Sequence, residues 1–425
     1  MAHNSGNSGL SHEPAPPSAA AGSAREVLTA FLRLGCISFG GPTAHLGYFH
    51  AEFVERRRWL SEQSYAEIVA LAQSLPGPAS SQTGFALGLL RAGWPGGLAA
   101  WFGFTLPSAL LMLAFALGHS RITGKLGQGA VHGLQLVAVA VVAQAILAMR
   151  KRLAPDALRI ALALLAAAMV YFSGQTVLAI VTGALLGWLL LRKLQPAQLH
   201  PDAAGLTPAI AGLSRRAGVF AGALFCALLL LLPISASLSE KLPSARAAGQ
   251  PLAVANAFFR SGALVFGGGH VVLPLLERAV VARGWVDQAA FLSGYGAAQA
   301  IPGPLFTFAA YLGAVIRPTP SPVAFGALAL VAIFLPGLLL IATLLPFWSG
   351  LRQRSWMQSC LAGVNAAVVG ILLAAFIRPV CSSAVHSPFD LVVALAALVL
   401  LVRYKLPPWQ IVVSVALLSA LVRTL

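Results

Sequence analysis

Apolar stretches recur along most of this chain, and that pattern limits the fold more than any other feature of the sequence. Each stretch has roughly the 20 residues that a helix needs to cross a hydrocarbon layer of about 30 Å. The 425 residues are 58% hydrophobic and only 9% charged, whereas soluble domains carry about 25% charged residues. The sequence therefore excludes a water-soluble fold and predicts an all-α polytopic membrane protein.

Two diverged copies of one sequence unit make up most of the chain. Both copies contain F-x-R-x-G-x-x-x-F-G-G, which begins at Phe31 in the first and at Phe258 in the second. Both later contain A-Q-x-x-P-G-P, which begins at Ala72 and at Ala298. Chance similarity between two Leu/Ala-rich segments does not produce an ordered series of Arg, Gln, Gly and Pro, so we interpret the pattern as an internal repeat.

The repeat divides the chain into four predicted parts. Residues 1–24 are rich in Ser, Gly, Pro and Ala, and they lack the apolar core of a signal peptide, so a disordered cytoplasmic tail is expected. The first transporter repeat covers 25–193 and the second covers 254–425. Between them, 194–253 is a linker with one extra transmembrane span at 217–234.

Each copy is predicted to hold two broken segments followed by four uninterrupted spans. The breaks are Gly40-Gly41-Pro42 or Gly267-Gly268-Gly269, and the two Pro-Gly-Pro triplets. The broken segments are 26–55, 64–91, 254–277 and 288–313, and the spans are 97–118, 129–149, 156–172, 176–191, 323–348, 357–377, 389–402 and 408–424. The broken segments either cross the membrane or re-enter it as hairpins.

Loop charge favours the hairpins. Arg150-Lys151-Arg152 and the basic stretch 192–216 mark two cytoplasmic loops. Hairpins would also place Arg25, Arg56-Arg57-Arg58 and Arg91 in the cytoplasm. The single extra span then inverts the second copy, as in inverted-repeat transporters. The charge bias is weaker in that copy, and thirteen complete crossings are the competing topology (four broken segments, eight spans and the extra one).

The breaks are the predicted sites of chemistry. Irregular backbone inside a bilayer must line a cavity or be buried in protein. A helix that starts at the second proline of Pro-Gly-Pro would point its free N–H groups inward, where they attract anions. Hydroxyls follow these prolines at Ser80, Ser81, Thr83 and Thr307. They would either form an oxyanion cradle or satisfy local carbonyls and allow close helix packing.

Other polar residues occupy matching places in the two copies. Arg33 and Arg260 lie inside apolar helical stretches, where an arginine is a functional candidate; alternatively each reaches an interface or pairs with a carboxylate. Gln73 and Gln299 precede the Pro-Gly-Pro triplets and would bind substrate or cap the broken backbone. The candidate substrate-binding residues are Arg33, Gly40, Gly41, Gln73, Pro76, Gly77, Pro78, Ser80, Ser81, Thr83, Arg260, Gly267, Gly268, Gln299, Pro302, Gly303, Pro304 and Thr307.

Proton coupling would fall to Glu67, His45 or His270, since a histidine can titrate near neutral pH. No metal or cofactor is predicted, because the four cysteines are widely separated and show no C-x-x-C spacing. The net charge of +16 lies mostly in short loops and not in a basic stripe interleaved with aromatics, so nucleic-acid binding is not expected.

With these motifs in both halves, residues 26–425 resemble the chromate ion transporter (CHR) family, specifically its long-chain members with two fused homologous domains. The resemblance implies export of chromate from the bacterial cytoplasm across the inner membrane, driven by the proton motive force, with a cytoplasmic N-terminus. Sulfate is the analogous anion. Gly269 departs from the pattern, since the first copy has Pro42 there.

Two other functions are weighed against chromate export. The first is a carrier for sulfate or another oxyanion. The second is an integral membrane enzyme, which would need carboxylates, a histidine pair or a metal cluster beside a cavity; the chain has only twelve acidic residues, mostly scattered. As partners we expect an oxyanion and the lipid bilayer, and a homodimer is compatible with the sequence.

Overall fold

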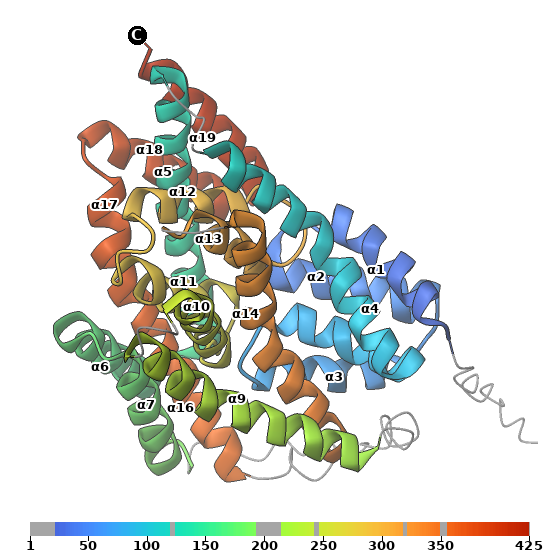
Figure 1. Ribbon diagram of the computed structural model, residues 1–425. Helices are drawn as coiled ribbons and strands as arrows, with labels where there is room; N and C mark the ends of the chain where they lie inside the picture. The colour runs from blue at the N-terminus through green and yellow to red at the C-terminus, as the bar shows by residue number, and fades with distance from the viewer. Residues whose placement is uncertain are drawn as a thin grey trace, which may run out of the picture.

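The computed structural model describes residues 22–119, 124–192, 214–241, 246–317, 321–348 and 355–424. Those residues form helices and no strand, which confirms the all-α prediction (Figure 1). Most of the predicted N-terminal tail, and the linker up to residue 213, lie outside the described residues.

Within the described residues, five helices are long and apolar enough to cross a membrane. They are α4 (Ala79–His119), α5 (Lys125–Leu153), α9 (Arg215–Lys241), α14 (Pro322–Leu344) and α16 (Ser355–Ala375). They coincide with the predicted spans at 97–118, 129–149, 217–234, 323–348 and 357–377. The prediction of a polytopic membrane protein is therefore confirmed, and α9, the extra span, runs along the outer edge of the bundle (Figure 1).

The four remaining predicted spans are shorter than a complete crossing. Helices α6 (Ala157–Ser173), α7 (Thr176–Leu190), α18 (Pro388–Val402) and α19 (Pro408–Val422) have 15 to 17 residues, and a rise of 1.5 Å per residue makes them about 22–26 Å long. Each pair packs against the long helix of the other copy. Helices α6 and α7 cover α16, and α18 and α19 cover α5, so the two copies interlock.

The first two broken segments are hairpins. The first consists of α1 (Ala24–Ile37), the glycine break, and α2 (Gly41–His50) with its continuation η1 (Ala51–Arg56). The second consists of α3 (Glu62–Ser74), the Pro-Gly-Pro break and the first arm of α4. The Glu26 carboxylate lies 3.7 Å from Nη1 of Arg57 and 3.2 Å from Nη2 of Arg91. Since the ends of both segments meet at Glu26, neither segment crosses to the opposite face.

Helix α4 itself folds back after the second hairpin. Ala92 and Gly93 have non-helical backbone angles, and Gly93 has a φ of 63°. The arms 79–91 and 94–119 pack so closely at Gly88 and Gly96 that a side chain on either glycine would clash with the other arm. The arm 94–119 is therefore the crossing helix that was predicted over 97–118.

The second copy repeats this arrangement. Its first broken segment is α10 (Arg246–Ala263) followed by η3 (Gly269–Val271), α11 (Val272–Leu276) and η4 (Glu277–Val281). Its second is α12 (Gln288–Ala298) followed by η5 (Leu305–Thr307) and α13 (Phe308–Val315). The backbone N–H of Arg317 donates to the carbonyl of Trp285 at 3.0 Å, so the ends of the two segments meet here as well.

Two arginines and a tryptophan join the hairpin ends in each copy. Arg57 and Arg91 lie over the Trp59 ring, 5.6 and 5.1 Å from its centroid. The residues at the matching positions are Arg283, Trp285 and Arg317, and Arg283 lies 5.0 Å from the Trp285 centroid. The ring contact gives Arg283 a packing role in the second copy.

The order of helices inverts the second copy relative to the first. After the first hairpins the chain crosses through the second arm of α4, returns through α5, passes out and back through the pair α6 and α7, and crosses once more through α9. The second copy therefore starts at the opposite face. Consistent with this, Nη1 of Arg278 donates to the hydroxyl of Thr176 at 2.9 Å, at the far turn between α6 and α7.

The breaks of the two copies meet and exchange hydrogen bonds. The N–H of Gly77 donates to the carbonyl of Val265 at 2.7 Å, and the N–H of Gly303 donates to the carbonyl of Ser38 at 2.9 Å. Gly77 matches Gly303 and Ser38 matches Val265, so the two bonds are related by an approximate two-fold axis. Both glycines need positive φ, 124° and 94°, which disfavours other residues there.

Candidate functional site: a cavity where the four breaks meet

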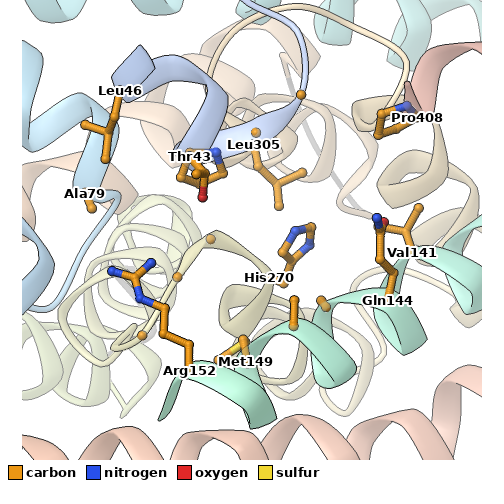
Figure 2. Close-up of a pocket in the computed structure, with 18 of the residues that line it drawn as sticks. Thr43, Leu46, Ala79, Val141, Gln144, Met149, Arg152, His270, Leu305 and Pro408 are labelled. Carbon is orange, nitrogen blue, oxygen red and sulfur yellow. The ribbon is translucent and has the colours of Figure 1, made fainter. Parts of the chain in front are cut away.

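A cavity of about 1060 Å³ lies where the breaks converge. Backbone from all four breaks lines it, with Gly40 and Gly41, Gly267 and Gly268, Gly77, and Gly303 in its wall. Irregular backbone therefore occurs where protein encloses a hollow, as a bilayer requires. Figure 2 shows how side chains from separate elements enter this space.

Four helix N-termini reach the cavity. The first residues of α2, α4, η3 and η5 are Gly41, Ala79, Gly269 and Leu305, and all four line it. Helices η3 and η5 continue without interruption into α11 and α13. The first N–H groups of a helix have no partner within the helix and carry partial positive charge. Four such ends around one hollow produce an environment that favours an anion.

The side chains in the wall add positive charge and hydrogen-bond donors. Arg152 at the end of α5 and Lys405 in the turn between α18 and α19 are the cations. Amides come from Gln73, Gln144, Gln299 and Asn365. Among the lining residues that the structure describes, none is Asp or Glu. The charged side chains of the wall are therefore all positive, and polar donors lie among its apolar residues, which suits a small oxyanion and disfavours a cation.

Several of the polar side chains in the wall already have protein partners. Nη2 of Arg152 donates to Oε1 of Gln73, so a cation from the first copy's long helix lies beside the first Pro-Gly-Pro. Nδ1 of His270 lies 2.8 Å from the hydroxyl of Tyr295. In Figure 2 the guanidinium of Arg152 and the ring of His270 both point into the hollow.

The side-chain amide of Gln299 has an unused donor. Within the described residues, Nε2 of Gln299 has no hydrogen-bond partner. A buried donor without an acceptor costs about 1–3 kcal/mol. An oxyanion in the cavity would provide the acceptor, so this amide is a candidate ligand.

Fewer than half of the predicted site residues, nine of 21, line the cavity. They are Gly40, Gly41, Gln73, Gly77, Gly267, Gly268, Gln299 and Gly303, together with His270 from the predicted proton-coupling set. Pro76, Pro78, Pro302 and Pro304 shape the breaks but are not in the wall.

The predicted hydroxyl cradle does not reach the cavity. Ser80, Ser81, Thr83 and Thr307 are buried outside its lining. The hydroxyl of Thr83 donates to the carbonyl of Ala79 at 2.8 Å, and that of Thr307 donates to the carbonyl of Pro304 at 2.9 Å. These contacts match the alternative interpretation, in which hydroxyls satisfy local carbonyls at a helix start.

Arg33 and Arg260 also lie outside the cavity. Both side chains occupy exposed faces of α1 and α10. Glu67 is absent from the wall, and His45 is buried behind it, with Nε2 3.1 Å from the carbonyl of Ser38 and Nδ1 3.3 Å from the hydroxyl of Ser80. The expected convergence of these residues on one cavity is therefore not observed.

Sequence reasoning missed Arg152, Lys405, Gln144 and Asn365. They come from α5, α16 and the turn before α19, which are far in sequence from the breaks. Arg152 was visible as part of a basic triplet, but that triplet indicated only a cytoplasmic loop. No sequence signal connected it to Gln73, 79 residues away.

Comparison with known proteins agrees with the internal repeat. A family model described as a chromate transporter matches residues 25–188 and again 252–420, so both copies match one unit. It describes a transporter and not an enzyme.

Similar proteins cover most of the chain. A chromate transport protein of Cupriavidus metallidurans is 28% identical over 97% of this chain and 98% of its own length. A chromate transport protein of Pseudomonas aeruginosa is 29% identical over 82% of this chain and 79% of its own. A probable chromate transport protein of Synechococcus elongatus is 29% identical over 84% of each chain. No solved structure matches.

Proposed function

Because this chain belongs to the chromate transporter family, we propose that it is a secondary transporter that exports chromate from the cytoplasm across the inner membrane of a bacterium. The observation that carries the proposal is the cavity at the meeting point of the four breaks. It has four helix N-termini, two cationic side chains and no acidic side chain among its described lining residues. Inverted-repeat transporters bind their substrates in such places, between broken helices.

Arg152 and Lys405 supply the counter-charge for the dianion in this proposal. Arg152 is held by Gln73, and a guanidinium can give two parallel hydrogen bonds to an oxyanion. Gln299 donates its unpaired amide N–H to another oxygen. The glycines of the breaks, Gly40, Gly41, Gly77, Gly267, Gly268 and Gly303, let backbone approach the anion closely.

Loop charge supports the direction of transport. The basic triplet that ends with Arg152 marks its loop as cytoplasmic, and Arg152 and Lys405 lie in the wall, so we propose that chromate enters from the cytoplasm. The N-terminus is then cytoplasmic as well. Moving one charge across 100 mV is worth about 2.3 kcal/mol, so a dianion that leaves a negative-inside cell gains roughly twice that. The membrane potential is the electrical part of the proton motive force, so we propose that the proton motive force drives export in this way.

The same wall gives sulfate as a second candidate substrate. The cationic side chains and amides of the wall would bind the oxygens of a tetrahedral dianion. None of them would contact the central atom. Charge and shape alone therefore do not separate sulfate from chromate, and selectivity must come from size and hydration.

Transport into everted membrane vesicles tests the proposal. Energised vesicles that contain this protein should accumulate labelled chromate, and vesicles without it should not. Failure to accumulate chromate, with a known exporter active in parallel, would reject chromate export. Inhibition by sulfate at concentrations far below those of unlabelled chromate would identify sulfate as the preferred anion.

A further inference from the structure

His270 faces the cavity from the second copy's glycine break. It is the second residue of η3, and its ring points into the hollow (Figure 2). Its Nδ1 lies 2.8 Å from the hydroxyl of Tyr295, which is fully buried on α12. Nε2 has no protein partner among the described residues and is left for the cavity.

The histidine has no equivalent in the first copy. Gly40 matches Gly267, so the residue that matches His270 is Thr43, which also lines the cavity. Tyr295 likewise matches Val69. The imidazole and its phenol partner are therefore a feature of one copy only, and they make the two sides of an otherwise symmetric site chemically different.

His270 is also the wall residue whose ordinary pKa lies nearest to neutrality. The other titratable or charged groups in the described wall are Arg152, Lys405 and Tyr48, whose ordinary pKa values are about 10 or above, whereas that of histidine is about 6.5. The elements packed on η3 present Asn365 from α16 and Leu305 from η5, and neither residue titrates. Tyr295 is the titratable group in direct contact with it.

We propose that His270 is the proton-carrying group of the cavity, and that its imidazolium form holds the oxyanion while its neutral form releases it. Protonation adds an N–H donor at Nε2 and one positive charge to the wall. The imidazole takes up a proton from water on the side where the anion enters and gives it up from Nε2 when the anion departs. Each turnover then carries one proton out with the dianion, and a net charge of −1 still moves down a negative-inside potential. This inference rests on the proposed function, because it assigns the proton step of the same site.

The test measures chromate binding to the full-length protein in lipid nanodiscs. Calorimetry gives the binding affinity at each pH from 5.5 to 8.5. Above the pKa of His270, affinity should fall about tenfold per pH unit, because binding then requires uptake of one proton. Calorimetry in two buffers with different ionisation enthalpies counts that proton directly. Chromate itself takes up a proton in this range, so the readout is the difference between the natural protein and its variants.

His270→Gln should still bind chromate but should take up one proton fewer per anion and lose that tenfold dependence. The matched control is His386→Gln, which removes an imidazole outside the cavity wall and should behave like the natural protein. Tyr295→Phe removes the phenol partner and keeps the imidazole, so it should shift the midpoint of the pH dependence without abolishing it.

Two results would overturn the proposal while leaving the proposed function intact. One is equal proton uptake by His270→Gln and the natural protein. The other is a pH dependence of chromate affinity whose midpoint is the same in Tyr295→Phe as in the natural protein. This second result serves as the test if His270→Gln does not fold. Absence of chromate binding to the natural protein at every pH would instead reject the proposed function.

Discussion

Arginines of this chain serve three different purposes, and their surroundings separate them. Arg57 and Arg91 join hairpin ends at Glu26 and Trp59. Arg33 lies on the exposed face of α1 beside Leu32 and Ile37, which are also exposed; a long side chain there can reach the membrane interface. Arg152 alone of these four lines the cavity. Apolar surroundings in the sequence are therefore insufficient to identify a substrate-binding arginine.

Substitution of Arg152 should affect transport far more than substitution of Arg33. Arg152→Gln removes a charged hydrogen-bond donor, which is worth about 1.5–3 kcal/mol, and the apparent affinity for chromate should fall about 10- to 100-fold. Arg33→Gln removes the same charge outside the cavity and is the control. Uptake of chromate into everted vesicles over a concentration series measures both variants.

The reverse order of effects would contradict the role of Arg152 as counter-charge. Arg152→Gln would then bind chromate with wild-type affinity, and Arg33→Gln would lose transport at equal membrane abundance. That result would identify Arg33 as the residue that supplies the counter-charge.

At the scale of elements, the glycine and Pro-Gly-Pro breaks hold the two copies together. The reciprocal bonds of Gly77 and Gly303 require backbone with positive φ at a point of close approach. A Cβ on Gly77 would lie 3.0 Å from Cα of Gly337, and one on Gly303 would lie 2.6 Å from the hydroxyl oxygen of Ser108. Ser108 and Gly337 occupy matching positions in the two copies. The same approximate two-fold axis therefore relates the contact of Gly77 with Gly337 to that of Gly303 with Ser108.

Gly303→Ala should destabilise the protein more than Gly124→Ala. Both glycines have similar φ, 94° and 90°, and an alanine at either position pays a similar strain of about 1–3 kcal/mol. Gly124 faces open space, whereas Gly303 faces Ser108. Thermal unfolding of the detergent-purified variants should therefore give a lower Tm for Gly303→Ala, and equal Tm values would contradict the close packing at the break.

Much of the element-level architecture could be predicted from the sequence. Hydropathy located the helices, and loop charge around Arg56-Arg57-Arg58 favoured hairpins, which the contacts of Glu26 confirm. The packing of α6 and α7, and of α18 and α19, on the long helix of the other copy could not be predicted. The contacts of Gly183 with Gly363 and of Gly133 with Ala416 leave no periodic pattern in the sequence. The sequence led us to expect two helix N-termini at the cavity, and the structure has four. The other two could not be predicted, because the long-range contacts that bring them there leave no signal in the sequence.

At the scale of the whole molecule, inversion produces a single site from two copies. The pseudo-two-fold axis brings the breaks of both copies together, and the side chains then make the site unequal through His270, Arg152 and Lys405. The cavity is therefore symmetric in backbone and asymmetric in charge.

Cysteine labelling tests the inversion. Arg56 and Ala282 are matching, exposed positions near the hairpin ends of the two copies. In a background without Cys36, Cys226, Cys360 and Cys381, a membrane-impermeant maleimide added to intact cells should label a cysteine at 282 and not one at 56. Labelling of both positions from the same side would contradict the inverted arrangement.

The location of bound chromate shows whether the four breaks form the oxyanion site. Crystals of the full-length protein grown with chromate should give an anomalous chromium peak inside the cavity, surrounded by the first residues of α2, α4, η3 and η5. A chromium peak at another place, or no peak in the cavity at a saturating chromate concentration, would contradict the claim that the four breaks form the oxyanion site.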